Sequence, residues 1–325
     1  MAQKVAITGA FSYSGRYLAK LLLDQGHQVV NLSSRQAPIA SAPLSPSDIQ
    51  RVQSFPLDFS DELRLGKALE GCSVLWCTYW IRFQRDGDTF AAAAQRCQKL
   101  FQLAKEAGVR RIVYTSHTHA TVDSPFPYIS GKARAVAALR ESGVSYAVAR
   151  PCGIFGDAPR ESILMNNAAW VLRRSPLFLL AGDGMQRFQP IHVRDMAQLL
   201  LHLGRLGEAR PCNEERDACG PDAPTALELF RHLATSVGAW SRVSAPGVLS
   251  TRLVTRMTQP INWITGDILL DGDDLDLLCS GLTVAEVPSD PDIASRRSLM
   301  TWISEAGDRL GEEYVSSMKR YYYTR

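Results

Sequence analysis

The stretch Val5-Ala-Ile-Thr-Gly-Ala-Phe-Ser-Tyr-Ser-Gly-Arg-Tyr-Leu18 decides the fold of this chain. A short β-rich run ends at Gly9, and Gly15 opens a segment whose leucines recur on one helical face. Glycines here permit a tight turn and let a pyrophosphate approach the backbone N–H groups of a helix N-terminus. The stretch predicts a dinucleotide-binding loop, with Ser12 in the middle position of Gly-x-x-Gly-x-x-Gly. The alternative is an ordinary turn between a strand and a helix.

Strand and helix patterns alternate over the first 150 residues. Strands are predicted at Val5–Thr8, Val29–Leu32, Phe55–Leu57, Val74–Cys77, Arg111–Thr115 and Ser145–Ala149. Helices are predicted at Arg16–Gln25, Asp61–Glu70 (with Ser60 as N-cap), Asp88–Ala107 and Tyr128–Ser142, and Ser41–Ser47 is predicted to be a loop. This order predicts an α/β fold with a doubly wound parallel sheet of the Rossmann type.

The pattern loosens after Arg150. Helices are predicted at Ser162–Arg174, Asp195–Leu203, Ala226–Gly238 and Leu299–Tyr323, and a strand at Gln189–Val193. We expect an NAD(P)-binding domain over residues 1–155, to which residues 188–203 return. Residues 156–325 are expected to form a smaller, mixed and largely helical lobe that shapes a substrate cleft.

The composition excludes several classes of protein. The net charge of +3 is too small to indicate a nucleic-acid partner. Seven cysteines without a C-x-x-C pair indicate reduced thiols and a reducing compartment such as the cytoplasm. Because the chain opens on a strand, no signal peptide is expected. The most apolar region, Ile163–Ala181, contains asparagines and arginines, so no transmembrane segment is expected.

The residues after the second and third strands bear on the choice of cofactor. No acidic residue stands between Asp24 and Asp48 to accept hydrogen bonds from the ribose of NAD. Ser33, Ser34 and Arg35 can bind a 2′-phosphate instead, so NADP(H) is preferred and NAD(H) is the alternative. Arg35 can also be an ordinary surface residue. Asp58, followed by Phe59, stands either beside the adenine or in a turn.

Tyr128 and Lys132 are four residues apart on one face of a predicted helix. An ammonium lowers the pKa of a nearby phenol, which can then exchange a proton while a hydride moves. Ser116 and Thr118 follow the fifth strand and can steady a substrate oxygen, although His117 competes for that position. His117 and His119 face opposite ways on a strand and lack acidic partners, so no metal site is expected.

Several motifs together carry a resemblance to a known family. Gly9-x-x-Ser-x-x-Gly15, Tyr128-x-x-x-Lys132, Arg150-Pro151 and Pro190-Ile-His-Val-Arg-Asp195 resemble the extended or atypical short-chain dehydrogenase/reductases. Thr78-Tyr-Trp-Ile-Arg-Phe83, Pro127-Tyr-Ile-Ser-Gly-Lys-Ala133, Asn166-Asn-Ala-Ala-Trp170, Gly182-Asp-Gly184 and Cys219-Gly-Pro221 are similar to a bacterial NAD-dependent epimerase/dehydratase group. That group is similar to the NADPH-binding accessory subunit of respiratory complex I. The likeness is strongest from residue 3 to about residue 235.

The resemblance implies roles for individual residues. The pyrophosphate would be lined by Gly9, Phe11, Ser12, Tyr13 and Gly15, and the rest of the cofactor by Cys77, Thr78, Tyr79, Thr115, Lys132 and Pro151. Tyr128 and Lys132 would be the acid/base pair. The chain departs from the family because only twelve positions separate Ser116 from Tyr128, which puts a full catalytic triad in question.

Two functions follow from these motifs. The first is an NAD(P)(H)-dependent oxidoreductase, epimerase or dehydratase acting on a small carbonyl or alcohol. Its cleft would be lined by Trp80, His117, Trp170 and Phe188, although buried aromatics are more often core residues. The second is a non-catalytic NADP(H)-binding sensor, assembly factor or complex subunit. The chain is accordingly expected to act alone on a small molecule, as a homo-oligomer, or within a protein complex.

Overall fold

The computed structural model describes residues 2–35, 38–39, 41–85, 87–209, 211–267, 272–286 and 296–319. A seven-stranded sheet has the order β10-β6-β5-β4-β1-β2-β3, and every neighbouring pair is parallel. Its strands are β1 (Lys4–Thr8), β2 (Gln28–Leu32), β3 (Gln53–Phe55), β4 (Cys72–Cys77), β5 (Arg111–Thr115), β6 (Ser145–Pro151) and β10 (Glu214–Ala218). The strands β1, β2, β4, β5 and β6 are largely buried and rich in apolar residues, as is usual for parallel strands covered on both faces.

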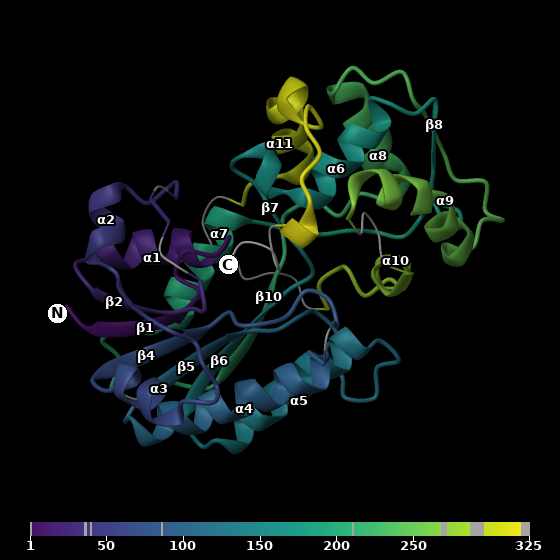
Figure 1. The fold of residues 1–325 in the computed structure, drawn as a ribbon. Helices are drawn as coiled ribbons and strands as arrows, with labels where there is room; N and C mark the ends of the chain where they lie inside the picture. The colour runs from purple at the N-terminus through teal and green to yellow at the C-terminus, as the bar shows by residue number, and fades with distance from the viewer. Residues whose placement is uncertain are drawn as a thin grey trace.

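Helices cover both faces of this sheet (Figure 1). One face carries α3 (Glu62–Leu69), α4 (Phe90–Glu106) and α5 (Pro127–Glu141), and the other carries α1 (Gly15–Asp24), α2 (Pro46–Arg51) and α7 (Val193–Leu203). Each face has its own buried apolar cluster. The Trp76 indole Nε1 donates to the Leu200 carbonyl at 2.6 Å and ties α7 to the sheet. The predicted fold class is confirmed.

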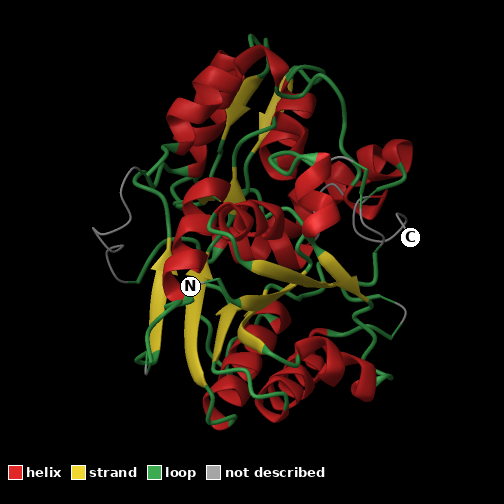
Figure 2. Cartoon of the chain, turned by 90° about the vertical axis from the view of Figure 1, so that its left-hand side faces the viewer, coloured by secondary structure: helices red, strands yellow, loops and turns green. Residues whose placement is uncertain are grey.

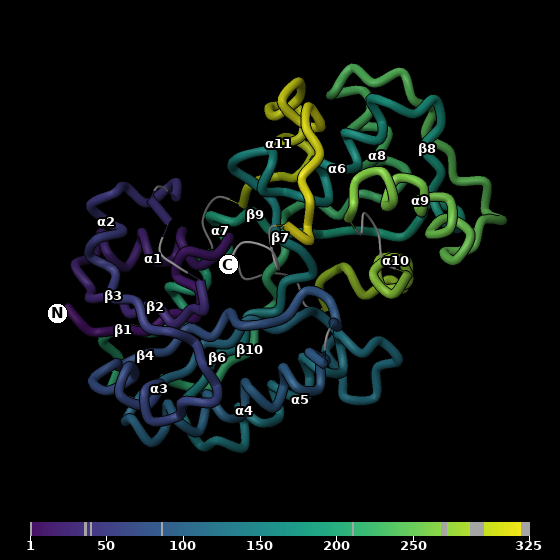
Figure 3. Tube along the Cα trace, viewed as in Figure 1, coloured from purple at the N-terminus to yellow at the C-terminus, as the bar shows by residue number. Residues whose placement is uncertain are grey.

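A second lobe lies above the sheet (Figure 2). It contains α6 (Ile163–Leu172), β8 (Leu177–Leu179), α8 (Ala226–Ser236), β11 (Arg242–Ser244), α9 (Thr251–Thr265), α10 (Gly272–Cys279) and α11 (Leu299–Ala306). The short strands β7 (Ile154–Phe155) and β9 (Ile191–His192) pair where the chain passes between sheet and lobe (Figure 3). Two 3₁₀ turns, Pro159–Glu161 and Gly307–Arg309, also belong to this part of the chain. The lobe has a separate apolar cluster around Leu172, Leu233 and Ile303.

Four local predictions were wrong. Helix α2 begins within the predicted loop Ser41–Ser47, because Ser45 and Asp48 form a reciprocal capping box and Pro46 suits a first helical turn. Strand β3 lies two residues before the predicted Phe55–Leu57.

The other two concern helix ends. The N-cap of α3 is Asp61, whereas Ser60 bonds to Asp58. Helix α11 ends at Ala306, since Gly307 has φ +25°; the end of the predicted helix beyond Lys319 lies outside the described residues.

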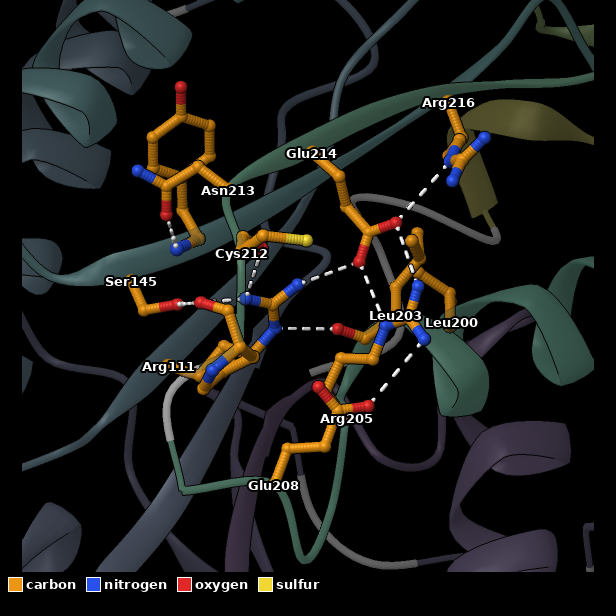
Figure 4. A network of polar contacts seen from close by, with 12 residues as sticks. Arg111, Ser145, Leu200, Leu203, Arg205, Glu208, Cys212, Asn213, Glu214 and Arg216 are labelled. Carbon is orange, nitrogen blue, oxygen red and sulfur yellow. Dashed lines mark hydrogen bonds and ion pairs between the residues drawn. The ribbon is translucent and has the colours of Figure 1, made fainter.

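A buried charge network holds β10 at the edge of the sheet (Figure 4). Glu214 accepts from Arg111 at 3.0 Å and from Arg205 at 3.0 Å, and its side chain is 7% exposed. Arg111 also donates to the Leu203 carbonyl at 2.7 Å and to the Ser145 hydroxyl at 2.8 Å. The network therefore links β5, β6, β10 and the end of α7 at the edge where the strands begin.

Candidate functional site

The glycine loop joins the end of β1 to the start of α1. Gly9 has φ +72°, a backbone conformation that side chains disfavour. A Cβ on Gly15 would lie 2.0 Å from the Gly9 carbonyl oxygen and 2.9 Å from the Ser12 hydroxyl. Only glycine therefore permits the first turn of α1 to sit this close to the strand. This is the cradle that a pyrophosphate at a helix N-terminus requires.

Two polar side chains shape the loop from within. The Ser12 hydroxyl accepts from the Gly15 N–H at 3.3 Å, while the Ser12 N–H donates to the Gly9 carbonyl at 2.8 Å. Asn31 on β2 is fully buried, and its Oδ1 accepts from the Ala10 N–H at 2.7 Å. Sequence reasoning missed Asn31, although an amide within the apolar run Val29–Leu32 was a signal.

The other predicted loop residues point to different places. The Tyr13 hydroxyl donates to the Gly156 carbonyl at 3.1 Å, so it bridges the loop to the start of the second lobe. Phe11 packs on the apolar cluster beneath α1. Roles for both at the pyrophosphate stay predictions.

The loops after β2 and β3 lie side by side, because the Ser33 N–H donates to the Phe55 carbonyl at 3.0 Å. Ser34 and Arg35 are exposed there, and the Arg35 N–H donates to the Ser33 hydroxyl at 3.1 Å. Asp58 is also exposed and accepts from the Ser60 N–H at 2.9 Å and from its hydroxyl at 2.6 Å. Asp58 thus shapes a turn, and a role toward the adenine stays a prediction.

The end of β4 is tied to the end of β1. The Thr78 N–H donates to the Thr8 hydroxyl at 2.7 Å, and the Thr78 hydroxyl donates to the Thr8 carbonyl at 2.6 Å. Cys77 is fully buried before it. Tyr79 lies over Phe59, with ring centroids 5.1 Å apart, and its hydroxyl accepts from Arg96 at 3.2 Å. Thr78 therefore lies beside the start of the glycine loop, while Tyr79 lies against Phe59 and Arg96.

Lys132 is buried at the edge where β4 and β5 end. Its Nζ donates to the Thr115 carbonyl at 2.7 Å and lies 4.3 Å from the Trp80 ring centroid and 5.0 Å from that of Tyr114. Among the described residues, no carboxylate pairs with it. Burial lowers the pKa of Lys132 from its ordinary 10.5 to about 8. The aromatic faces and the carbonyl therefore stabilise the charged form of Lys132 less than water would.

This burial predicts a pH-dependent stability. Between pH 8 and 10.5 the unfolded chain keeps the Lys132 proton that the folded chain releases, so stability rises with pH. The two pKa values imply a gain of about 3 kcal/mol, at about 1.4 kcal/mol for each tenfold change in the protonation equilibrium. Urea unfolding of the native chain and of Lys132→Met, from pH 7 to 10.5, measures the difference. The prediction would be refuted if the free energy of unfolding changed with pH in the same way in the two proteins.

Tyr128 stands on the same helix as Lys132 and faces an aromatic wall. Its ring centroid lies 5.4 Å from that of Phe90, 6.1 Å from that of Trp80 and 5.9 Å from that of His117. His117 is buried, and burial lowers its pKa to about 4, so the imidazole is neutral at pH 7. The structure thus gathers Tyr128, Lys132, Trp80 and His117 at one edge of the sheet.

Three buried polar atoms at this edge have no hydrogen-bond partner within the described part of the chain. They are the Ser116 hydroxyl, the Thr115 hydroxyl and the Trp80 indole N–H, and the hydroxyl of Tyr114 on β5 is a fourth such atom nearby. Unpaired buried polar atoms are rare in folded proteins and commonly face a ligand. The Thr118 hydroxyl, by contrast, donates to the Leu282 carbonyl at 2.9 Å. Two hydroxyls, those of Ser116 and Thr118, were predicted to meet a substrate. Of these, the Ser116 hydroxyl is the one that has no hydrogen-bond partner among the described residues.

The remaining predicted site residues lie further along the chain. Pro151 is buried, and its carbonyl accepts from the Thr118 N–H at 3.3 Å. Phe188 packs on the lobe cluster and against Gly153, where a Cβ would lie 2.8 Å from its ring. Trp170 makes an edge-to-face contact with Tyr314 in the second lobe, with ring centroids 5.4 Å apart.

Residues 9–169 match the model of a family described as NAD(P)H-binding. This segment is similar to the NAD(P)H-binding domains of that family. The predicted class of cofactor, a nicotinamide dinucleotide, is thereby confirmed. The residues present fit it: Gly9 and Gly15 leave the cradle open, and unpaired polar atoms remain at the ends of β4 and β5.

Several proteins are similar over most of the chain. NADH dehydrogenase [ubiquinone] 1 alpha subcomplex subunit 9, mitochondrial, of Arabidopsis thaliana is 24% identical over 244 residues, which are 73% of this chain and 58% of that subunit. The chain therefore spans little more than half of that relative. An NADPH-dependent quinone oxidoreductase of Escherichia coli, solved with NADPH, is 22% identical with a TM-score of 0.68, and the match covers 93% of this chain and 99% of that one.

A triphenylmethane reductase of Citrobacter sp., solved with NADP(H), is 18% identical with a TM-score of 0.69, again over 93% of this chain and 99% of that one. The predicted resemblance to nicotinamide-dependent reductases and to a complex I subunit is confirmed. Within the described ranges, no helix is long and apolar enough to cross a bilayer, and no group of three or more His, Cys, Asp or Glu side chains could hold a metal ion.

Proposed function

We propose that the chain is an NADP(H)-dependent oxidoreductase of the short-chain type that reduces a small conjugated carbonyl compound. The observation that carries this proposal is the cluster of Tyr128, Lys132 and the unpaired Ser116 hydroxyl. The cluster lies at the carboxyl ends of β4 and β5, on the same edge as the glycine loop. In parallel α/β sheets this edge is where cofactor and substrate meet.

Each residue has a chemical task in this proposal. A bound NADPH supplies a hydride. Tyr128 donates its phenolic proton to the carbonyl oxygen as that oxygen becomes negative, and the Lys132 charge stabilises the phenolate left behind. Ser116 donates a hydrogen bond to the same oxygen. Trp80 and Phe90 supply an apolar wall for a flat substrate, in keeping with the quinone and dye acceptors of the two reductases similar in fold.

The preference for NADP(H) rests on the loop after β2. Arg35 stands exposed there beside Ser33 and Ser34, and the acid that would select NAD is absent from the sequence at this point. A guanidinium with two hydroxyls suits a 2′-phosphate.

Tyr128→Phe tests the proposed function. The variant keeps the ring in its aromatic wall and removes only the proton donor, so turnover is expected to fall by about 10²–10⁴-fold while NADPH affinity changes by less than about twofold. The assay follows NADPH oxidation with a panel of benzoquinones, naphthoquinones, a triphenylmethane dye and aromatic aldehydes.

Tyr146→Phe is the matched control, because it removes a phenol from β6 at the opposite edge of the sheet. It is expected to turn over like the native chain. Undiminished turnover in Tyr128→Phe would remove Tyr128 from the mechanism.

A second candidate function is a non-catalytic NADP(H)-binding subunit. Lys132 already donates a hydrogen bond to the Thr115 carbonyl, which favours this second function. The similarity to the Arabidopsis complex I subunit also favours it. This function predicts tight NADPH binding, no NADPH oxidation with any acceptor in the panel, and a stable protein partner. Robust turnover that depends on Tyr128 would rule it out.

A further inference from the structure

Helix α9 carries two apolar stripes, and only one of them packs on the protein. The inner stripe includes the buried Val254, which meets Leu275 of α10. The second stripe consists of Leu253, Met257, Pro260 and Ile264, spaced so that they fall on one flank of the helix. All four are exposed, and Ile264 is 76% exposed. The lobe's own core therefore makes no use of this flank.

The polar side of the same helix is basic. Arg252 and Arg256 lie on the exposed flank beside the second stripe. Trp263 lies further along the same flank and is 89% exposed. The sequence of α9, TRLVTRMTQPINWIT, contains two arginines and no acidic residue. A basic helix with an outward apolar stripe and an exposed tryptophan has the composition of helices that lie in the interface of a membrane.

Other exposed apolar residues do not form such a set. Ile39, Leu63 and Met185 are single residues on separate segments, as is normal on a protein surface. On α9 four large apolar side chains share one helix, namely Leu253, Met257, Trp263 and Ile264. Figure 1 shows α9 on the right-hand side of the upper lobe, where no other helix of the described residues lies further out. The stripe is thus accessible to a flat surface.

We propose that α9 docks the protein on the surface of a bilayer that contains anionic phospholipids. The helix would lie in the plane of the interface, with Leu253, Met257 and Ile264 among the upper acyl chains and Trp263 at the headgroup level. Arg252 and Arg256 would meet lipid phosphates. Charge complementarity selects a lipid surface here, because a purely apolar partner would leave both guanidinium groups unmatched. The proposal is independent of the chemistry at Tyr128.

Flotation of the full chain with vesicles tests this proposal. Vesicles of phosphatidylcholine alone are compared with vesicles that contain phosphatidylglycerol, at low and high salt. The chain is expected to float with the anionic vesicles at low salt and to be released by salt. Arg252→Gln with Arg256→Gln is expected to lower partitioning about 30-fold. Trp263→Ser with Ile264→Ser is expected to lower it at least about tenfold.

Trp240→Ser is the matched control, because Trp240 is 67% exposed but lies outside α9. It is expected to float like the native chain. Since all these side chains are exposed, thermal unfolding of every variant is expected to match that of the native chain. The proposal is overturned if the native chain does not float with anionic vesicles, or if the α9 variants bind these vesicles as well as the control does. It is also overturned if α9 instead binds a second copy or a soluble protein without any affinity for lipid.

Discussion

Gly15→Ala is expected to weaken NADPH binding by at least about 100-fold. The new Cβ would lie 2.0 Å from the Gly9 carbonyl oxygen, which is backbone and cannot rotate away. The first turn of α1 must therefore shift away from β1, and its N–H groups lose their alignment toward a pyrophosphate. Two hydrogen bonds to a charged group contribute about 1.5–3 kcal/mol each, which gives the stated loss.

Gly66→Ala is the matched control for this prediction. Gly66 lies within α3, and a Cβ there would meet no atom within 4 Å. Alanine is therefore expected to stabilise α3 by about 0.5–1 kcal/mol and to leave cofactor binding unchanged. Fluorescence titration with NADPH and NADH, with circular dichroism to verify folding, measures both effects. The native chain is expected to bind NADPH more tightly than NADH. A folded Gly15→Ala protein that binds NADPH normally would contradict the proposed cradle.

Glu214→Gln is expected to destabilise the fold by about 3–5 kcal/mol, because it leaves buried cationic side chains without their shared anion. Glu214 accepts from Arg111, Arg205 and Arg216, and the Arg111 side chain is only 2% exposed. Burial by itself raises the pKa of Glu214, but the hydrogen bonds and charges of Arg205 and its neighbours outweigh burial and lower the pKa. The stabilisation is therefore present at neutral pH and lost as pH falls below about 4.

Glu208→Gln provides the comparison within the same network. Glu208 is 49% exposed and pairs with Arg205 at 3.5 Å, so its loss is expected to change stability by less than about 1 kcal/mol. Urea unfolding at pH 7 measures both variants. Because the network lies where the strands begin, folded Glu214→Gln protein is expected to bind NADPH as the native chain does. Equal stabilities of the two variants would show that the buried network contributes no more than a surface pair.

Much of the fold could be predicted because its signals are local. The alternation of apolar strands and amphipathic helices depends on residues within a few positions of one another, and Arg111–Thr115 was predicted with its observed bounds. The errors have local causes too, since the capping box of Ser45 and Asp48 outweighed a loop-like composition. The last strand of the sheet, β10, was not predicted, because Glu214–Ala218 is polar and pairs only with β6 at the sheet's edge.

The candidate site likewise has features that the local sequence predicted and features that depend on long-range contacts. That Tyr128 and Lys132 share a helical face could be predicted from their spacing, whereas the structure shows that Lys132 reaches the end of β5. The sequence could not predict which hydroxyl after β5 remains without a hydrogen-bond partner, because the Thr118 hydroxyl donates to the carbonyl of Leu282, 164 residues later. The edge-to-face contact of Trp170 with Tyr314 is another long-range contact.

By itself, then, the sequence determined the dinucleotide-binding domain through Gly9, Gly15 and the order of strands and helices. Tertiary structure alone decided that Asn31 supports the glycine loop, that Ser116 rather than Thr118 keeps an unpaired hydroxyl, and that α9 turns an apolar stripe outward. The physical reason is that periodicity and turn chemistry act over a few residues. Hydrogen-bond partners and exposure depend instead on which distant segments the completed fold brings together.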